Sequence, residues 1–261
     1  MSIGILALGL SIAMAVFQHN TTPATRHVRP IDNRLLKACE SDNLKQILSL
    51  LRQGANPNAK DKLGQTPLLL LLNAPRFTGR HVVGQPKETK DEDGTTHYSV
   101  YVMEDDSVSA SASDTRAVKA LISSGANVNA HDQFGTTAAM LAACHKTMAC
   151  IKLLVSKGAS LKAVDEDSGT ALDWASGHNR VEMLRYLTSK GLNAKHKRKT
   201  DGVTSLMLEA SGGSVESVKL LLNHGADVNA KSNDGNTALK CAKEAGNQSV
   251  VELLKEAGAK E

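Results

Sequence analysis

The chain lacks the short motifs that mark the common catalytic sites. It contains no Gly-x-Ser-x-Gly nucleophile elbow, no Gly-x-x-x-x-Gly-Lys phosphate loop, no His-Glu-x-x-His zinc motif and no Rossmann glycine pattern. Asp173, Trp174 and His178 lie close together in sequence, but they fall in a predicted helix where we expect a structural role. The sequence therefore favours a binding protein over an enzyme, with no small-molecule substrate and no cofactor.

Aromatic residues and cysteines are also scarce. Phe, Trp and Tyr make up 3% of the chain, and there are 4 cysteines, each inside a predicted helix, where a free thiol packs as a small apolar group. Cys144 and Cys150, with His145 between them, lack the second ligand pair of a zinc site. No metal site is expected.

No apolar run is long enough for a comfortable membrane span of about 20 residues. The run Ile3–Phe17 contains Ala13-Met14-Ala15, which resembles a signal-peptide cleavage site. We expect residues 1–20 to be a signal peptide or a short N-terminal anchor, and residues 21–30 to be a linker. The first 20 residues hold no Lys or Arg, so a membrane-associated anchor or a misassigned start stays open. The predicted location is periplasmic or secreted, or alternatively membrane-anchored.

The chain does contain a phrase, Gly-Ala-x-x-x, that recurs at a fixed interval. Its glycines are Gly54, Gly125, Gly158, Gly191, Gly225 and Gly258, so the intervals are 71, 33, 33, 34 and 33 residues. A constant period near 33 indicates one supersecondary unit that is copied and stacked, because a single copy cannot bury its own apolar face. The chain is therefore predicted to be a solenoid.

Each copy is predicted to hold two helices. In the last copy, Thr237 is placed to cap a helix whose apolar residues recur at helical spacing, and Gly246 ends that helix. Val250, Val251, Leu253 and Leu254 give the apolar face of a second helix, which Gly258 closes.

These residues resemble the ankyrin repeat over about residues 31–261. The second copy matches through Gly64, Thr66, Pro67 and Leu68. The fifth copy matches through Gly202, Thr204, Leu206, Gly213, Val218, Leu221, Leu222, Gly225, Ala226, Val228, Asn229 and Ala230. The resemblance implies an all-α ankyrin-repeat solenoid of about six helix-turn-helix units that binds a protein partner.

The interval of 71 residues exceeds one repeat of 33 by 38, which places an insertion at about residues 75–113. β-Formers at His81–Val83 and Thr96–Val102 flank a charged tip and predict a hairpin. The insertion carries four basic and seven acidic residues, a net charge of −3. Tyr98 and Tyr101, with Asp105 and Asp106, are candidate partner-binding residues, because interfaces favour tyrosine anchors with a polar rim. A disordered surface loop is the alternative.

Two further candidates lie in the fourth and fifth copies. Lys197, Arg198 and Lys199 belong to a basic tract that suits an acidic protein surface or an anionic head group, and nucleic acid is not expected because no aromatic stacking platform accompanies them. Glu209 replaces a small alanine between helices. A buried unpaired carboxylate is costly, so we expect it to tilt into the concave groove or to find a cation.

Within this family, the signal-like start is similar to that of exported bacterial ankyrin proteins. That resemblance implies an inhibitory binding protein such as a toxin-immunity protein. The alternatives are a companion of a periplasmic catalase in peroxide resistance, or a host-directed ankyrin effector.

Overall fold

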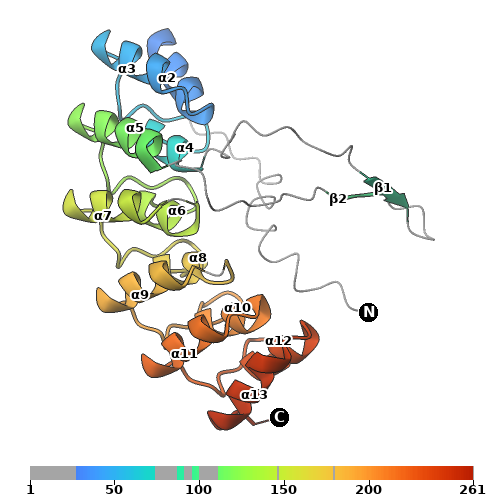
Figure 1. The fold of residues 1–261 in the computed structure, drawn as a ribbon. Helices are drawn as coiled ribbons and strands as arrows, with labels where there is room; N and C mark the ends of the chain where they lie inside the picture. The colour runs from blue at the N-terminus through green and yellow to red at the C-terminus, as the bar shows by residue number, and fades with distance from the viewer. Residues whose placement is uncertain are drawn as a thin grey trace.

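A computed structural model describes residues 28–73, 87–90, 96–99, 111–145, 147–178 and 180–260. Within these residues the helices follow one another in pairs. The pairs are α2 (Pro30–Glu40) and α3 (Leu44–Arg52), α4 (Pro67–Asn73) and α5 (Ser111–Ser123), α6 (Ala138–His145) and α7 (Met148–Ser156), α8 (Ala171–Ala175) and α9 (Val181–Ser189), α10 (Ser205–Gly212) and α11 (Val215–Asn223), and α12 (Ala238–Glu244) and α13 (Gln248–Glu256). Figure 1 shows the pairs stacked into a curved column.

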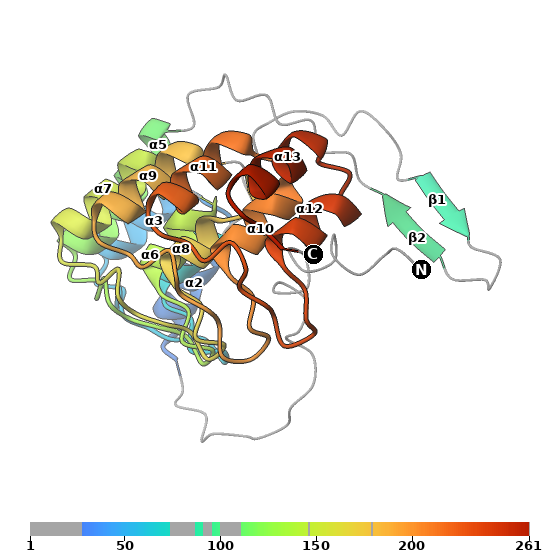
Figure 2. The same cartoon turned by 90° about the horizontal axis from the view of Figure 1, so that it is seen from below.

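The stacked pairs form two layers. Helices α2, α4, α6, α8, α10 and α12 make the inner layer, and α3, α5, α7, α9, α11 and α13 make the outer layer (Figure 1). The loops that join one pair to the next project together from one side of the stack (Figure 2), and we call them fingers. The repeats are thus all-helical, and the predicted solenoid is confirmed.

Threonine side chains set where the inner helices begin. Thr204 Oγ1 accepts from the backbone N–H of Met207, and Thr237 Oγ1 accepts from that of Lys240. A cap of this kind satisfies one of the free amides of the first helical turn. The predicted cap at Thr237 is confirmed.

Glycine ends the outer helices in a left-handed turn. Gly125 has φ +92 and its counterpart Gly158 has φ +86, a region that residues with a Cβ rarely adopt. The amide after each glycine donates to a carbonyl of the helix, as from Ala126 to Leu121 at 3.0 Å. This turn reverses the chain into the next finger, which explains the recurring Gly-Ala.

One continuous apolar core runs through the column. Leu121, Ile151 and Leu154 of the outer layer and Met140 and Leu172 of the inner layer are all buried in it. The core joins neighbouring pairs rather than closing inside each pair, as expected for a solenoid.

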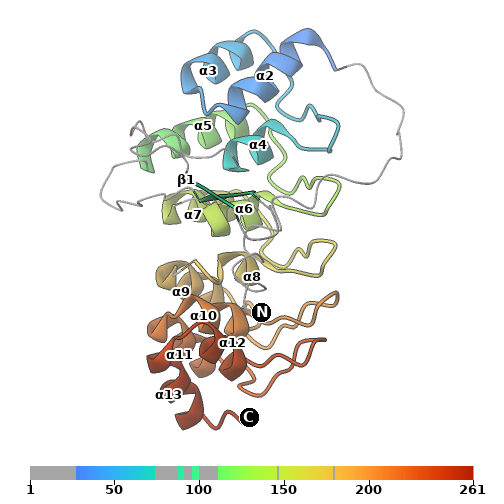
Figure 3. The same ribbon diagram turned by 90° about the vertical axis from the view of Figure 1, so that its right-hand side faces the viewer.

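The insertion separates α4 from α5. Within it, β1 (Lys87–Lys90) pairs antiparallel with β2 (Thr96–Ser99), with Lys87 opposite Ser99 and Lys90 opposite Thr96. Helix α5 begins at Ser111, three residues before the expected Asp114. The remainder of residues 75–110 lies outside the described residues, so an ordered hairpin insertion stays a prediction. Figure 3 shows the column from the right-hand side of Figure 1.

Residues 1–27, which include the expected signal segment and most of the linker, also lie outside the described residues. Within the residues that are described, no helix combines the length and the apolar character needed to cross a membrane.

Candidate interaction surface

Asparagines tie most of the neighbouring fingers together. Asn58 Nδ2 donates to the carbonyl of Gly125 at 2.8 Å, and its Oδ1 accepts from the amide of Asn127 at 2.7 Å. Asn129 makes the same pair of bonds to Gly158 and Ser160, and Asn229 to Gly258 and Lys260. Each of these asparagines lies four residues after a repeat glycine. They fix the fingers as one edge of the column.

Lysine replaces this asparagine on both sides of the α8–α9 pair. Lys162 and Lys195 lie four residues after Gly158 and Gly191, and neither can accept a backbone N–H as asparagine does. On the side of α10–α11, Asn233 still joins the two fingers through the carbonyls of Thr200 and Asp201, and side chains buried between the α8–α9 and α10–α11 pairs add a second contact. We call this contact the polar joint.

Asp173 of α8 is the centre of the polar joint. Its carboxylate accepts from Thr170 N at 2.9 Å, Thr170 Oγ1 at 2.8 Å and Ser205 Oγ at 2.6 Å, and it lies 3.1 Å from His196 Nδ1. Burial alone would raise the pKa of Asp173, but the hydrogen bonds from His196, Ser205 and Thr170 outweigh burial and hold this pKa below its usual value. The same contact with Asp173 raises the pKa of His196.

This arrangement is structural and not a catalytic triad. In a triad the histidine lies between the nucleophile and the carboxylate, whereas here Asp173 lies between Ser205 and His196. Trp174 also has a structural contact, because its Nε1 donates to Asp165 Oδ2 at 2.7 Å. His178 does not join Asp173, and its Nε2 lies 3.5 Å from Cys144 Sγ.

The basic tract lies on the finger that follows α9. Lys195, Lys197 and Lys199 are exposed there, and the backbone of Lys197 pairs with that of Thr204. Arg198 differs from our expectation, because its side chain is only 10% exposed and its Nε donates to Asp201 Oδ1 at 3.0 Å. Its charge serves the turn of the finger, since Asp201 also accepts from the amide of Val203 at 2.9 Å. The lysines are the residues of this finger that can meet a partner.

Glu209 corrects a prediction. It does not tilt into the concave groove, because it is 0% exposed between repeats, and no ion pair joins it to a cation of the described chain. Its Oε1 accepts from the backbone N–H of Gly177 at 2.7 Å, while its Oε2 has no hydrogen-bond partner in the part of the chain that the structure describes. Burial raises the pKa of Glu209, and the contacts with Gly177 and Ser217 only partly offset this. The residue therefore belongs to the polar joint and not to a binding surface.

The predicted residues of the insertion are not brought into a described site. Tyr98 lies in β2, where its backbone is opposite Glu88, and Tyr101, Asp105 and Asp106 lie outside the described residues. Their role in binding stays a prediction.

Possible metal ligands and reactive thiols were also sought among the described parts of the chain. No group of three or more His, Cys, Asp or Glu there has the arrangement of a metal site. Burial raises the pKa of the Cys144 thiol to about 11 and that of Cys39 to about 12, which disfavours the reactive thiolate.

Sequence reasoning missed the polar joint and a hollow on the outer layer. The signal for the joint was present, because lysine at residues 162 and 195 breaks the asparagine pattern of the other fingers. The hollow, between α5 and α7, is lined by Lys119, Ile122, Ser123, Leu153 and Lys157. Its signal was a repeated lysine position that becomes visible only when the outer helices are aligned.

The fold and its fingers define a helical-repeat scaffold for protein interaction. A profile described as "Ankyrin repeats (3 copies)" matches residues 107–198 and 190–261, which together are more than half of the chain. The chain belongs to the ankyrin-repeat family.

Solved structures of ankyrin-repeat domains are similar over most of the chain. The ankyrin repeat domain of Bcl-3, described as a unique member of the IkappaB protein family, is 26% identical with a TM-score of 0.58, covering 87% of this chain and 86% of that one. An ankyrin repeat domain from Acinetobacter baumannii AYE is 26% identical with a TM-score of 0.60, covering 87% of this chain and 98% of that one.

A curated relative matches only a short stretch. The ankyrin repeat and KH domain-containing protein mask of Drosophila melanogaster is 48% identical over 64 residues, which is 24% of this chain and 2% of that protein. The chain thus spans a small fraction of the length of this relative.

Proposed function

We propose that this ankyrin-repeat protein is a periplasmic binding or inhibitory protein, such as a toxin-immunity protein, that holds a protein partner against its inner layer and fingers. The observation that carries the proposal is the finger with three exposed lysines, Lys195, Lys197 and Lys199. Its two charged neighbours, Arg198 and Asp201, neutralise each other, so the lysines supply the net charge that a partner meets. An acidic protein surface is the complementary partner.

The insertion completes the proposed binding surface. We infer an array of six repeats in which the hairpin around β1 and β2 projects from the second. Tyr98 and Tyr101 supply two aromatic anchors close together in sequence, and Asp105 and Asp106 give this element a charge opposite to that of the basic finger. Two surfaces of opposite charge favour one orientation of a partner.

Replacing residues 75–110 by a short Gly-containing turn is expected to leave the melting temperature unchanged and to weaken partner binding. The two helices of every other pair in the described chain are joined by a short turn. Shortening a long loop lowers the entropic cost of closing it. Loss of an aromatic anchor costs about 2 kcal/mol or more of binding free energy. The measurement compares the affinities and melting temperatures of the intact and loop-shortened proteins for a partner recovered with the intact protein.

A matched variant separates the two surfaces. Lys197→Glu with Lys199→Glu alters the finger and leaves the insertion intact. Equal affinity of the loop-shortened and intact proteins, with weaker binding by the lysine variant, would assign recognition to the fingers alone. A collapsed melting temperature of the loop-shortened protein would show that the insertion is part of the core.

The proposed location rests on the apolar run Ile3–Phe17. A C-terminal reporter enzyme that is active only after export is expected to be active on the full chain and inactive when residues 1–20 are removed. The reason is that an apolar run of this length can direct export. Cytoplasmic fractionation of both forms would contradict the periplasmic assignment.

Of the alternatives, a companion of a periplasmic catalase uses the same surfaces for another partner, and a host-directed effector would leave the producing cell. A toxin or catalase gene beside this one would distinguish the candidates. The bacterial ankyrin domain from Acinetobacter baumannii supports a bacterial type of array.

A further inference from the structure

The outer layer carries basic residues at one repeated position. Lys119, Lys152, Arg185 and Lys219 each lie six residues before a repeat glycine, namely Gly125, Gly158, Gly191 and Gly225. All four are exposed. In the outer layer α5 contacts α7 and α9 contacts α11, and the four helices follow one another along the column, so equal positions in the repeat follow one another along its outer face (Figure 1).

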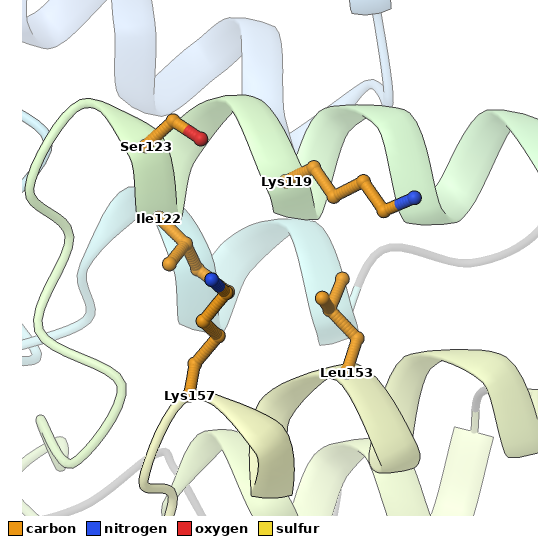
Figure 4. Close-up of a pocket in the computed structure, with 5 residues that line it drawn as sticks. All are labelled: Lys119, Ile122, Ser123, Leu153 and Lys157. Carbon is orange, nitrogen blue, oxygen red and sulfur yellow. The ribbon is translucent and has the colours of Figure 1, made fainter.

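A second repeated position adds two more lysines beside α7 and α9. Lys157 and Lys190 directly precede Gly158 and Gly191, and both are exposed. In the hollow between α5 and α7, Figure 4 shows Ile122 and Leu153 entering the space between the two helices from opposite sides, with Lys157 extending toward Ile122. Lys119 lines the same hollow from α5, so two cations accompany a hollow of about 220 Å³ with Ile122 and Leu153 as its apolar floor.

The same repeat positions are occupied one repeat later, by Lys152 on α7 and by Tyr186 and Lys190 at α9. Lys152 Nζ lies 6.0 Å and Lys190 Nζ lies 5.6 Å from the centroid of the Tyr186 ring. Tyr186 takes the place of Leu153 on the floor, because both lie five residues before a repeat glycine. A cation near an aromatic face is attracted by the ring quadrupole, so these two lysines are held in place before any partner arrives.

Carboxylates of the described chain do not neutralise four of these lysines, namely Lys119, Lys152, Lys157 and Lys190. Arg185, by contrast, contacts Glu216 at 2.9 Å and Glu182 at 3.8 Å, so the repeated position is compensated at α9. No ion pair joins Lys119, Lys152, Lys157 or Lys190 to a described residue, and α7 contains no Asp or Glu. The surface between α5 and α9 therefore has an unpaired positive charge above apolar floors.

We propose that this outer surface is a second docking site, and that its occupant is an acidic amphipathic helix of a protein partner. Carboxylates of the helix would meet the four lysines, and its apolar side chains would enter the hollow at Leu153 and pack against the ring of Tyr186. Packed helices lie about 8–10 Å apart, and side chains seven residues apart on an α-helix are separated by about 10.5 Å, so one helix can reach from the hollow at Leu153 to Tyr186.

A helix fits this surface better than a flat anionic membrane does. The apolar side chains of Ile122 and Leu153 lie in the hollow between α5 and α7. A flat membrane surface would contact the ammonium groups of the lysines without reaching these apolar side chains. The site is on the layer opposite to the inner helices. A partner bound to the inner layer and fingers, as in the proposed function, would leave it accessible, so the two sites can be tested separately.

The test uses the full chain and a labelled synthetic helix of about 18 residues with leucines flanked by glutamates at seven-residue spacing. A peptide of the same composition in scrambled order is the control for charge alone. We expect the ordered peptide to bind, and Lys152→Glu with Lys157→Glu to weaken binding about tenfold or more. The matched variant Lys60→Glu with Lys231→Glu makes the same change of charge on the fingers and is expected to leave the affinity nearly unchanged.

Backbone amide shifts on titration locate the contact, and those of α5, α7 and α9 are expected to move. Tyr186→Ala is expected to weaken binding while the melting temperature changes little, because Tyr186 is partly exposed. The proposal is overturned if the ordered peptide does not bind, if the scrambled peptide binds equally, if both charge variants weaken binding equally, or if the shifts fall on the inner layer. Binding of phosphatidylglycerol vesicles without peptide binding would assign the surface to a membrane instead.

Discussion

Replacement of Asp173 by alanine is expected to lower the free energy of unfolding by about 3–5 kcal/mol, because removing one partner from a buried charged pair leaves the others unsatisfied. Asp173 is 5% exposed and receives hydrogen bonds from Thr170 and Ser205 as well as the contact with His196. Its loss would remove part of the cap of α8 and leave the Ser205 hydroxyl buried without an acceptor. Urea unfolding followed by helical circular dichroism measures the change.

Two controls show whether the effect comes from the joint. Asp173→Asn keeps the shape and removes the charge, so it is expected to lose less than Asp173→Ala. Glu216→Ala breaks the exposed ion pair with Arg185 and is expected to cost less than about 1 kcal/mol. If Asp173→Ala costs no more than Glu216→Ala, the polar joint does not stabilise the array.

The pair of Asp173 and His196 also sets a pH window. The pKa of Asp173 is lowered from 3.8, so its contribution to stability is present above 3.8 and is lost as the pH falls through its folded pKa. The pKa of His196 is raised from 6.5, so its contribution is present below 6.5 and is lost as the pH rises through its folded pKa. Between these limits both contributions are complete. Asp165 and Arg198 act on His196 in opposite directions, and Asp165 supports its charged form.

Glu209→Gln is expected to raise the free energy of unfolding at pH 8 by about 1–3 kcal/mol, the range associated with an unsatisfied buried polar group. Glutamine keeps an oxygen that can accept from the N–H of Gly177. It removes the buried negative charge of the carboxylate, whose Oε2 has no hydrogen-bond partner among the described residues. Denaturant midpoints of the two proteins, measured across a pH series, test this expectation.

The direction of the pH effect is fixed by the raised pKa of Glu209. Stability from its neutral form is present below the ordinary glutamate pKa of 4.5 and is lost as the pH rises through the folded pKa. The advantage of glutamine should therefore shrink toward pH 4. A stability difference that is the same at pH 4 and pH 8, or a less stable Glu209→Gln protein at pH 8, would show that the carboxylate is well accommodated in its charged form. Glu252→Gln on α13 is a control, because Glu252 is exposed.

The joint connects stability to the proposed binding surface. His196 belongs to the finger that carries Lys195, Lys197 and Lys199, and it is attached to α8 through Asp173. Loosening this contact would therefore loosen the lysines with respect to the inner layer. Burial of Asp173 and Glu209 in the same interface makes the array sensitive to a change of charge there.

The sequence by itself determined the repeat. The Gly-Ala phrase fixes a left-handed turn, threonine caps the inner helix, and the leucine spacing gives each helix an apolar face, all within a window of about 33 residues. These are local signals, and every copy repeats them, so they identify the helices and the ankyrin architecture without knowledge of the packing. The same locality misled the interpretation of Arg198 and Glu209, whose exposure cannot be read from their neighbours in sequence.

Only the tertiary structure decided which charged side chains are buried or paired inside the array and which are exposed to a partner. Asp201 lies three residues from Arg198, but Gly177 lies 32 residues from Glu209 and Asp173 lies 32 residues from Ser205. Contacts such as the last two cross from one repeat to the next, and burial depends on how the stacked pairs close over them. The outer lysines show the converse, because Lys152 of α7 and Lys190 at the end of α9 approach the same Tyr186 ring only in the folded array. Sequence periodicity specifies the stack, and stacking assigns each charged residue its environment.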